Sequence, residues 1–253
     1  MPLEPTAPGG ARFERLDALR ALAMLWMAAF HFAFDLNHFQ LLSPKQNFYV
    51  DPFWTWQRSC IVSLFLFCAG MGQAVALQAG QGWARFWKRW VQIAGCALLV
   101  SAGSAIMFPR SWIFFGVLHG MALMLILCRL AAPLRGRPWV LWGLGALALA
   151  LPWVAAHPAL NGPAFSWIGL VTRKPVTEDY VPVLPWIGVM LWGLAAGHAL
   201  LQHRRHWLQG PLPARWRPLA WLGRWSLSFY MLHQPLLIGA ILAFVALRRS
   251  LGG

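Results

Sequence analysis

Long apolar stretches alternate with short polar or Pro- and Gly-containing segments along most of the chain. The stretches cover residues 19–38, 60–79, 90–108, 112–129, 139–156, 183–202 and 224–247. A helix needs about 20 mainly apolar residues to cross about 30 Å of hydrocarbon, and each stretch is close to that length. The pattern therefore predicts an all-α polytopic membrane protein with about seven transmembrane helices.

The segments between these stretches contain no candidate for a separate soluble domain and no convincing internal repeat. Residues 1–11 are rich in Pro and Gly and are predicted to form a flexible N-terminal tail. Residues 12–253 are predicted to form one transmembrane domain. The longest polar connection, residues 157–182, is either a substrate lid or a plain connector.

Composition supports the membrane assignment. Of the 253 residues, 59% are hydrophobic and 11% are charged, and the mean hydropathy is +0.54. A soluble domain carries about a quarter charged residues. The four cysteines, all inside apolar stretches, form no CxxC or other metal-ligand spacing, so they are interpreted as small buried side chains and no metal site is expected.

The net charge of +14 is the one feature that suggests a nucleic-acid partner, but the charges are distributed as in a membrane protein. If the N-terminus is cytoplasmic, roughly two thirds of the 21 Lys and Arg residues lie at the inner face. These are Arg12, Arg15, Arg20, Arg85, Lys88, Arg89, Arg129, Arg135, Arg137, Arg204, Arg205, Arg215, Arg217 and Arg224. The bias predicts a cytoplasmic N-terminus and a basic inner rim that attracts anionic lipid or an anionic ligand, with no nucleic acid bound.

An arginine and a histidine share one face of the first predicted helix. Arg20 and His31 are separated by ten residues, close to three helical turns, or roughly 16 Å along the axis. Asp35 and His38 follow near the same face. Ionisable groups inside a membrane are costly, so these residues are candidates for function.

The local spacing around His31 and Arg20 allows two interpretations for each residue. Asp35 lies four residues after His31, where it can fix one ring nitrogen as N–H and leave the other as a general base. The alternative is that the two residues only neutralise a polar seam between helices. Arg20 either meets an anionic ligand from the cytoplasm or forms a plain helix pair with Asp17.

Three further histidines lie in predicted helices. His119 and His233, taken alone, are typical of histidines that form hydrogen bonds between helices. His198 is expected near the inner membrane surface, partly in contact with water.

The first stretch also resembles a known family. RLDALRALAMLWMAAFHFAFDLNHF (15–39) is similar to the start of bacterial proteins related to heparan-α-glucosaminide N-acetyltransferase, and the Arg-x10-His spacing is shared with the acyltransferase-3 family. Further similar segments follow in order: FLFCAGMGQAVA (65–76), FGVLHGMAL (115–123), VPVLPWIGVMLWGLAAG (181–197) and LGRWSLSFYMLHQPLL (222–237). Ala21 stands where the family usually has Gly.

This resemblance implies an integral membrane acyltransferase of the bacterial inner membrane. Cytoplasmic acyl-CoA, with acetyl-CoA favoured, would donate its acyl group to an amine or hydroxyl of a sugar-type acceptor at the outer side. His31 would be the general base or, as a second route, an acyl carrier, and Asp35, His119 and His233 would be further catalytic residues. Arg20 and Arg224 would hold CoA phosphates, while Ser226, Ser228 and Tyr230 would bond the thioester oxygen.

Two other functions fit the same residues. In a proton-coupled transporter, His31, Asp35, His119 and His233 would form a proton relay. In a non-catalytic membrane subunit, they would only pack helices. Binding of acyl-CoA distinguishes the enzyme from both, while the acceptor and the oligomeric state are left open by the sequence.

Overall fold

A computed structural model describes residues 13–210 and 212–251. The predicted N-terminal tail, residues 1–11, lies outside the described residues. In the described part, the helices are α1 (Glu14–His38), α2 (Pro52–Gln78), α3 (Trp83–Met107), α4 (Val117–Leu130), α5 (Pro138–Ala155), α6 (Val183–His203), α7 (Arg205–Gln209), α8 (Arg217–Arg224) and α9 (Ser226–Ser250). Short 3-10 turns occupy Ala132–Gly136, Pro158–Leu160, Ser166–Ile168 and Ala214–Trp216. No strand is present there, and Phe115 forms an isolated bridge with Tyr180.

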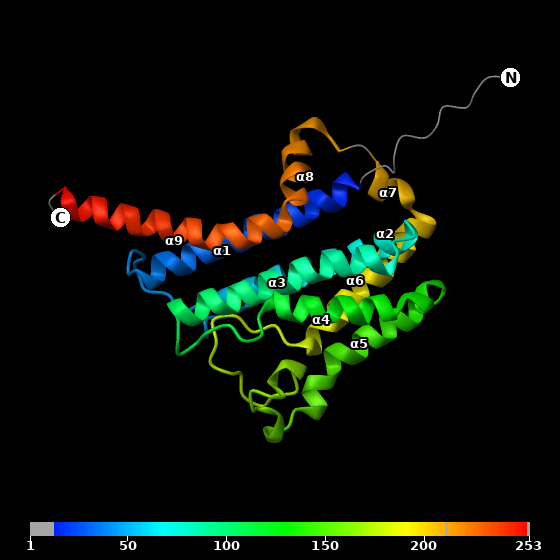
Figure 1. Cartoon of the computed structure of the whole chain (residues 1–253), viewed down its shortest axis with the longest axis horizontal. Coiled ribbons are helices and arrows are strands. Elements are labelled where there is room, and N and C mark those ends of the chain that lie inside the picture. Colours follow the sequence, from blue (N-terminus) through cyan, green and yellow to red (C-terminus); the bar gives the residue numbers. More distant parts are fainter. Residues whose placement is uncertain (1–12, 211, 252–253) are drawn as a thin grey trace.

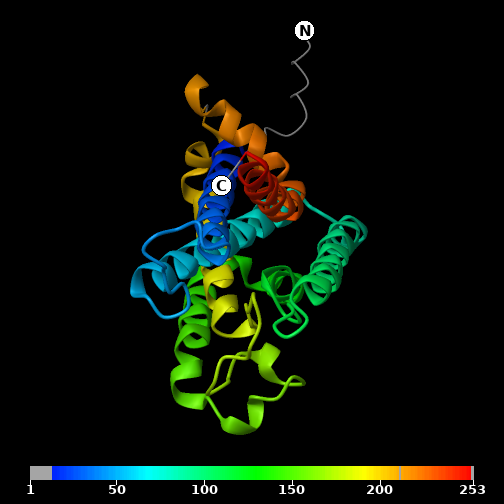
Figure 2. The same ribbon diagram turned by 90° about the vertical axis from the view of Figure 1, so that its left-hand side faces the viewer.

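Helices α1, α2, α3 and α9 run roughly lengthwise through the molecule, and α5 slants away from them (Figure 1). Helices α1 and α9 pack together on one side, α2 and α6 form the closest helix pair, and α5 packs on the far side of α6. Figure 2 shows α3 standing off to one side of this stack. One end of the bundle, called here the basic end, carries the start of α1, the α2–α3 and α4–α5 turns, α7 and α8 (Figure 1). The other, the loop end, carries residues 39–51, 108–116 and 156–182.

The predicted all-α membrane architecture is confirmed, with one difference in helix length. Six helices in the described residues, α1, α2, α3, α5, α6 and α9, are long and apolar enough to cross a membrane. The fourth predicted span, 112–129, is instead the 14-residue helix α4, which begins at Val117. The residues before Val117 are not helical.

Side-chain hydrogen bonds explain why the fourth span starts late. The hydroxyl of Ser104 accepts from the backbone N–H of Ile113 at 2.9 Å, and the hydroxyl of Ser101 donates to its carbonyl at 2.6 Å. The carboxylate of Asp179 accepts from the N–H of Val117 at 2.7 Å. These partners satisfy the backbone outside a helix, so the apolar residues before Val117 are held in a non-helical conformation against α3.

The position at which α2 begins is set by its N-cap residue and a proline. The side chain of Asp51 accepts from the N–H of Phe53 at 2.9 Å, and Pro52 occupies the first turn. A carboxylate N-cap followed by Pro favours a helix start at this position. As a result α2 begins eight residues before the apolar stretch predicted from residue 60.

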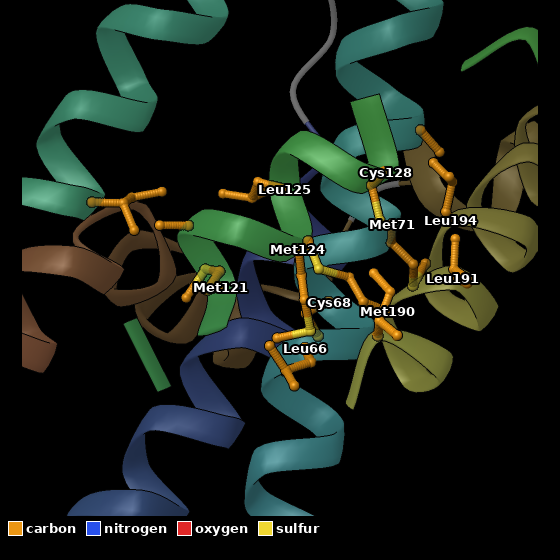
Figure 3. Close-up of a cluster of buried hydrophobic side chains, with 14 of the residues drawn as sticks. Leu66, Cys68, Met71, Met121, Met124, Leu125, Cys128, Met190, Leu191 and Leu194 are labelled. Atoms are coloured by element: carbon orange, nitrogen blue, oxygen red, sulfur yellow. The ribbon is translucent and has the colours of Figure 1, made fainter. Parts of the chain in front are cut away.

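The core lies between α2, α4 and α6 and is rich in sulfur. Figure 3 shows side chains from these three helices meeting in one cluster. Its fully buried members include Leu66 and Cys68 of α2, Met124 of α4, and Met190 and Leu194 of α6. Unbranched thioethers fill irregular gaps between helices, which fits a core made where three helices converge.

Gly70 lies at the closest approach of α2 and α6. A methyl group there would overlap the backbone of Met190 and lie 2.8 Å from the backbone N of Leu194. Gly70→Ala is therefore expected to destabilise the protein by about 1–3 kcal/mol, because the backbone of α6 must shift. Thermal unfolding in neutral detergent measures this. Gly143→Ala is the matched control, since its Cβ would meet no atom within 4 Å; an equal Tm for the two variants would contradict the prediction.

Candidate active site

Two of the predicted histidines face each other across the contact between α1 and α9. The ring centroids of His31 and His233 are 5.3 Å apart. Phe30 lies edge-on to His31 at 5.8 Å, and Phe229 lies parallel to His233 at 6.0 Å. The structure thus joins a histidine from the first helix with one from the last; they are called here the histidine pair.

The protonation site of His233 follows from its hydrogen bond. Its Nδ1 lies 2.7 Å from the carbonyl oxygen of Tyr230, which can only accept a hydrogen bond. Nδ1 therefore carries the proton in the neutral ring, and Nε2 keeps a lone pair. That Nε2 atom is buried and has no hydrogen-bond partner in the described residues. A neutral imidazole with a free, oriented lone pair is the form required of a general base.

The carboxylate of Asp35 has a different partner from the one expected. The side-chain amide of Gln234 donates to its two oxygens at 2.9 and 3.0 Å. No hydrogen bond between Asp35 and His31 occurs among the described residues. The expectation that Asp35 orients His31 is therefore corrected: Asp35 is buried and held by Gln234, and both residues border the histidine pair along α1 and α9.

Removing the amide of Gln234 should be costly, because a buried carboxylate would lose its donor. We expect Gln234→Ala to lower the stability by about 1–3 kcal/mol. Thermal unfolding in detergent provides the measurement. Gln57→Ala, which removes an exposed hydrogen bond to Trp26, is the control. A Tm as high as that of the control would exclude a supporting role for this contact.

His119 belongs to a separate network at the loop end. Its Nδ1 accepts from the N–H of Gly116 at 3.3 Å, so Nε2 carries the proton. Nε2 lies 3.1 Å from the hydroxyl oxygen of Ser101, whose own hydrogen goes to Ile113. None of the described hydrogen bonds or ring contacts joins His119 to the histidine pair. A catalytic role for His119 stays a prediction. In the structure both of its ring nitrogens have hydrogen-bond partners, at the N-cap of α4 and on α3.

His198 is placed differently from the expectation. It is 4% exposed on α6, and its Nε2 has no hydrogen-bond partner in the described residues. The expectation of a partly wet histidine is wrong because the dense packing of α6 against α2 and α5 covers it.

Arg20 forms one of the two arrangements expected from the sequence, and the other, contact with an anionic ligand, stays a prediction. Its Nη1 donates to the carboxylate of Asp17 at 3.0 Å, which is the plain helix pair. The guanidinium also lies against Gly72 of α2 and within electrostatic range of Arg89 on α3. Two cations near one another at the basic end favour a bound anion between them.

An open groove leads from this region along α3 and α9. Its volume is about 440 Å³, and its lining includes Arg89, Gln92 and Gly95 of α3 and Leu227 and Ser228 of α9. Few contacts join these two helices, and Figure 2 shows α3 apart from α9. The groove, called here the α3–α9 groove, joins a basic and amide-bearing part to an apolar part, which suits an elongated amphipathic ligand.

The other predicted CoA contacts are only partly brought to this groove. Ser228 lines it, whereas Arg224, Ser226 and Tyr230 do not. Arg224 lies 3.9 Å from the carboxylate of Glu14, and the ring of Tyr230 lies 5.7 Å from that of His233. Arg89 was recognised in the sequence only as part of the inner basic rim, because nothing in its spacing indicates that α3 and α9 form a groove.

Two acidic residues of the long loop 157–182 have structural partners that were missed in the sequence. Glu178 accepts from the hydroxyls of Ser111 at 2.5 Å and Tyr49 at 3.2 Å. Asp179 receives the N–H of Val117 at the start of α4, and burial raises the pKa of its carboxyl, while that N–H and the nearby Lys174 act in the opposite direction. These bonds attach the loop to residues 39–51 and to the start of α4.

Comparison with known proteins adds one match. A family model described as "Heparan-alpha-glucosaminide N-acetyltransferase, catalytic" matches residues 12–235. The matched range includes both members of the histidine pair and the residues that line the α3–α9 groove. No curated protein and no solved structure matches the chain.

Proposed function

The chain belongs to the family of the heparan-alpha-glucosaminide N-acetyltransferase catalytic domain, and on this basis we propose that it moves an acetyl group from acetyl-CoA to an amine or hydroxyl of a sugar-type acceptor. The observation that carries the proposal is the histidine pair, in which the Nε2 lone pair of His233 is buried and unpaired beside His31. The pair joins α1, which starts at the basic end, to α9, which lines the α3–α9 groove.

The proposed reaction needs a base that removes a proton from the attacking group and a step that delivers this proton to the leaving group. The acceptor N–H or O–H attacks the thioester carbonyl carbon; a C–N or C–O bond forms and the C–S bond breaks. His31 takes the proton of the attacking group, and His233 supplies a second acceptor in the same seam. The proton then goes to the departing CoA sulfur, which leaves as the thiol. General base catalysis of this kind contributes about 10²- to 10⁴-fold to the rate.

The donor is proposed to enter at the basic end, which the positive-inside rule predicts to face the cytoplasm. Arg20 and Arg89 would hold the CoA phosphates, since guanidinium groups bind phosphate oxygens in bidentate fashion. The pantetheine chain would lie in the α3–α9 groove past Ser228. The acceptor would approach the histidine pair from the loop end.

Arg89 provides the test of the donor site. Arg89→Ala is expected to weaken acetyl-CoA binding about tenfold or more, because a charge-assisted hydrogen bond contributes about 1.5–3 kcal/mol. Arg89→Lys should lose less, since the charge is kept. Calorimetry with purified protein measures both. Lys88→Ala removes a neighbouring cation outside the groove lining and should bind acetyl-CoA as wild type does. An equal loss of acetyl-CoA affinity in Lys88→Ala and Arg89→Ala would show that only the net charge matters.

A further inference from the structure

A second cavity lies at the loop end, at the far end of α1 from Arg20. It has a volume of about 490 Å³ and is formed by the last turns of α1 and by residues 45–49. Phe34, Asn37 and His38 line it from the helix, and Lys45, Asn47 and Tyr49 line it from the loop. It is called here the loop-end pocket.

The loop wall of this pocket is fixed to the helix. The side chain of Asn37 accepts from the backbone N–H of Gln46 at 2.7 Å and donates to its carbonyl at 3.0 Å. The next residue but one, Phe48, is 2% exposed and is stacked on Trp54 at 4.0 Å. The backbone at Gln46 is fixed to α1 and the ring of Phe48 is fixed to α2, so the loop that forms this wall has a defined position.

Lys45, an exposed residue, is the one lysine or arginine of the lining. Lys45 forms no ion pair or hydrogen bond in the described part of the chain, and no Asp or Glu lines the pocket. The hydroxyl of Tyr49 already donates to Glu178. Burial raises the pKa of this phenol to about 12, with the Glu178 carboxylate acting in the same direction. Tyr49 therefore stays neutral, and Lys45 is the charged side chain of the lining.

The pocket is in line with the histidine pair. His38 is seven residues beyond His31 on the same helix, or about 10 Å along its axis. His38 is also within electrostatic range of Asp35, which borders the pair. A sugar seated in the pocket would thus lie about two turns of α1 from His31. The rings of Phe34 and Tyr49, 6.1 Å apart, and the amide of Asn47 give the mixed aromatic and polar lining found in sites for polar ligands.

We propose that the loop-end pocket binds the acceptor through an anionic substituent, a phosphate, sulfate or carboxylate, with Lys45 as its counter-ion. The inference rests on the proposed function, because it supplies the acceptor side of the same reaction. The anion is carried either by a soluble sugar or by the headgroup of a lipid at the membrane surface.

Binding of glucosamine 6-phosphate and of glucosamine to the full chain in neutral detergent tests the pocket. Wild type should bind the phosphate about tenfold or more tightly than glucosamine, since a charge-assisted contact is added. Lys45→Gln should remove this difference, and Lys45→Arg should restore most of it. Arg110→Gln, which removes another exposed cation of the loop end outside the pocket lining, is the matched control. Equal binding of the two sugars by wild type, or an unchanged ratio in Lys45→Gln, would overturn the proposal.

Two further readouts separate the sources of the anion and the two proposals. Nanodiscs of phosphatidylcholine with or without phosphatidylglycerol are compared for wild type and Lys45→Gln. Competition by phosphatidylglycerol in wild type alone assigns the anion to a lipid headgroup; no competition assigns it to the sugar. Acetyl-CoA binding is measured on the same samples. If acetyl-CoA fails to bind while Lys45 still controls the sugar-phosphate preference, the transferase proposal fails and the pocket stands.

Discussion

Replacing His31 with alanine is expected to lower acetyl transfer by about 10²- to 10⁴-fold, because the step loses its base. Acetyl-CoA affinity should stay near that of wild type, since His31 does not line the α3–α9 groove. Transfer from labelled acetyl-CoA to an amino sugar gives the rate, and calorimetry gives the affinity. His203→Ala, which removes a histidine from the last turn of α6, is the control. A His31→Ala protein that transfers at the wild-type rate would exclude His31 as the base.

The partner histidine extends this prediction. His233→Ala should also reduce transfer strongly, because it removes the unpaired Nε2. If the two rings act as one unit, the double variant should lose little more than the more damaged single variant. Losses that multiply in the double variant would show that the two histidines act independently.

Filling the α3–α9 groove is expected to have the second large effect. Gly95 lines the groove, and a Cβ at this position would meet no atom within 4 Å. Gly95→Phe should therefore place a ring in the groove without disturbing the fold, and acetyl-CoA binding should fall by a factor of about 100 or more, since each 1.4 kcal/mol of lost binding free energy is tenfold.

Gly103→Phe is a matched control for this experiment. Gly103 is on the same helix, its Cβ would also meet no atom within 4 Å, and it does not line the groove. Both variants carry the same added aromatic area and lose the same glycine. Equal acetyl-CoA affinity for the two variants would show that the donor does not use this groove.

The sequence predicted the helical membrane fold well because the signal is long and apolar. It failed at residues 112–116, where apolar composition alone predicts a helix. Their backbone partners, Ser101, Ser104 and Asp179, come from other segments, and such partners are invisible in local periodicity. Start points such as Asp51 for α2 were missed for a different reason: N-caps extend helices beyond the hydrophobic stretch.

The sequence identified residues of the candidate site but not the contacts between them. The spacing from Arg20 to His31 places two groups on one helix face, but it cannot show that His233 packs beside His31. The spacing from His31 to Asp35 suggested a local pair, and a residue almost two hundred positions away, Gln234, takes that carboxylate instead. Local spacing gives the groups a helix can present, and helix packing decides which of them meet.

Transfer across a sealed membrane tests the central claim most directly. The protein is reconstituted in vesicles with the basic end outward, glucosamine is trapped inside, and labelled acetyl-CoA, which does not cross the bilayer, is added outside. The account predicts labelled N-acetylglucosamine inside the vesicles with wild type and none with His31→Ala. Product formed only outside the vesicles, or equal internal product with both proteins, would contradict a donor bound at the basic end and an acceptor reached from the loop end.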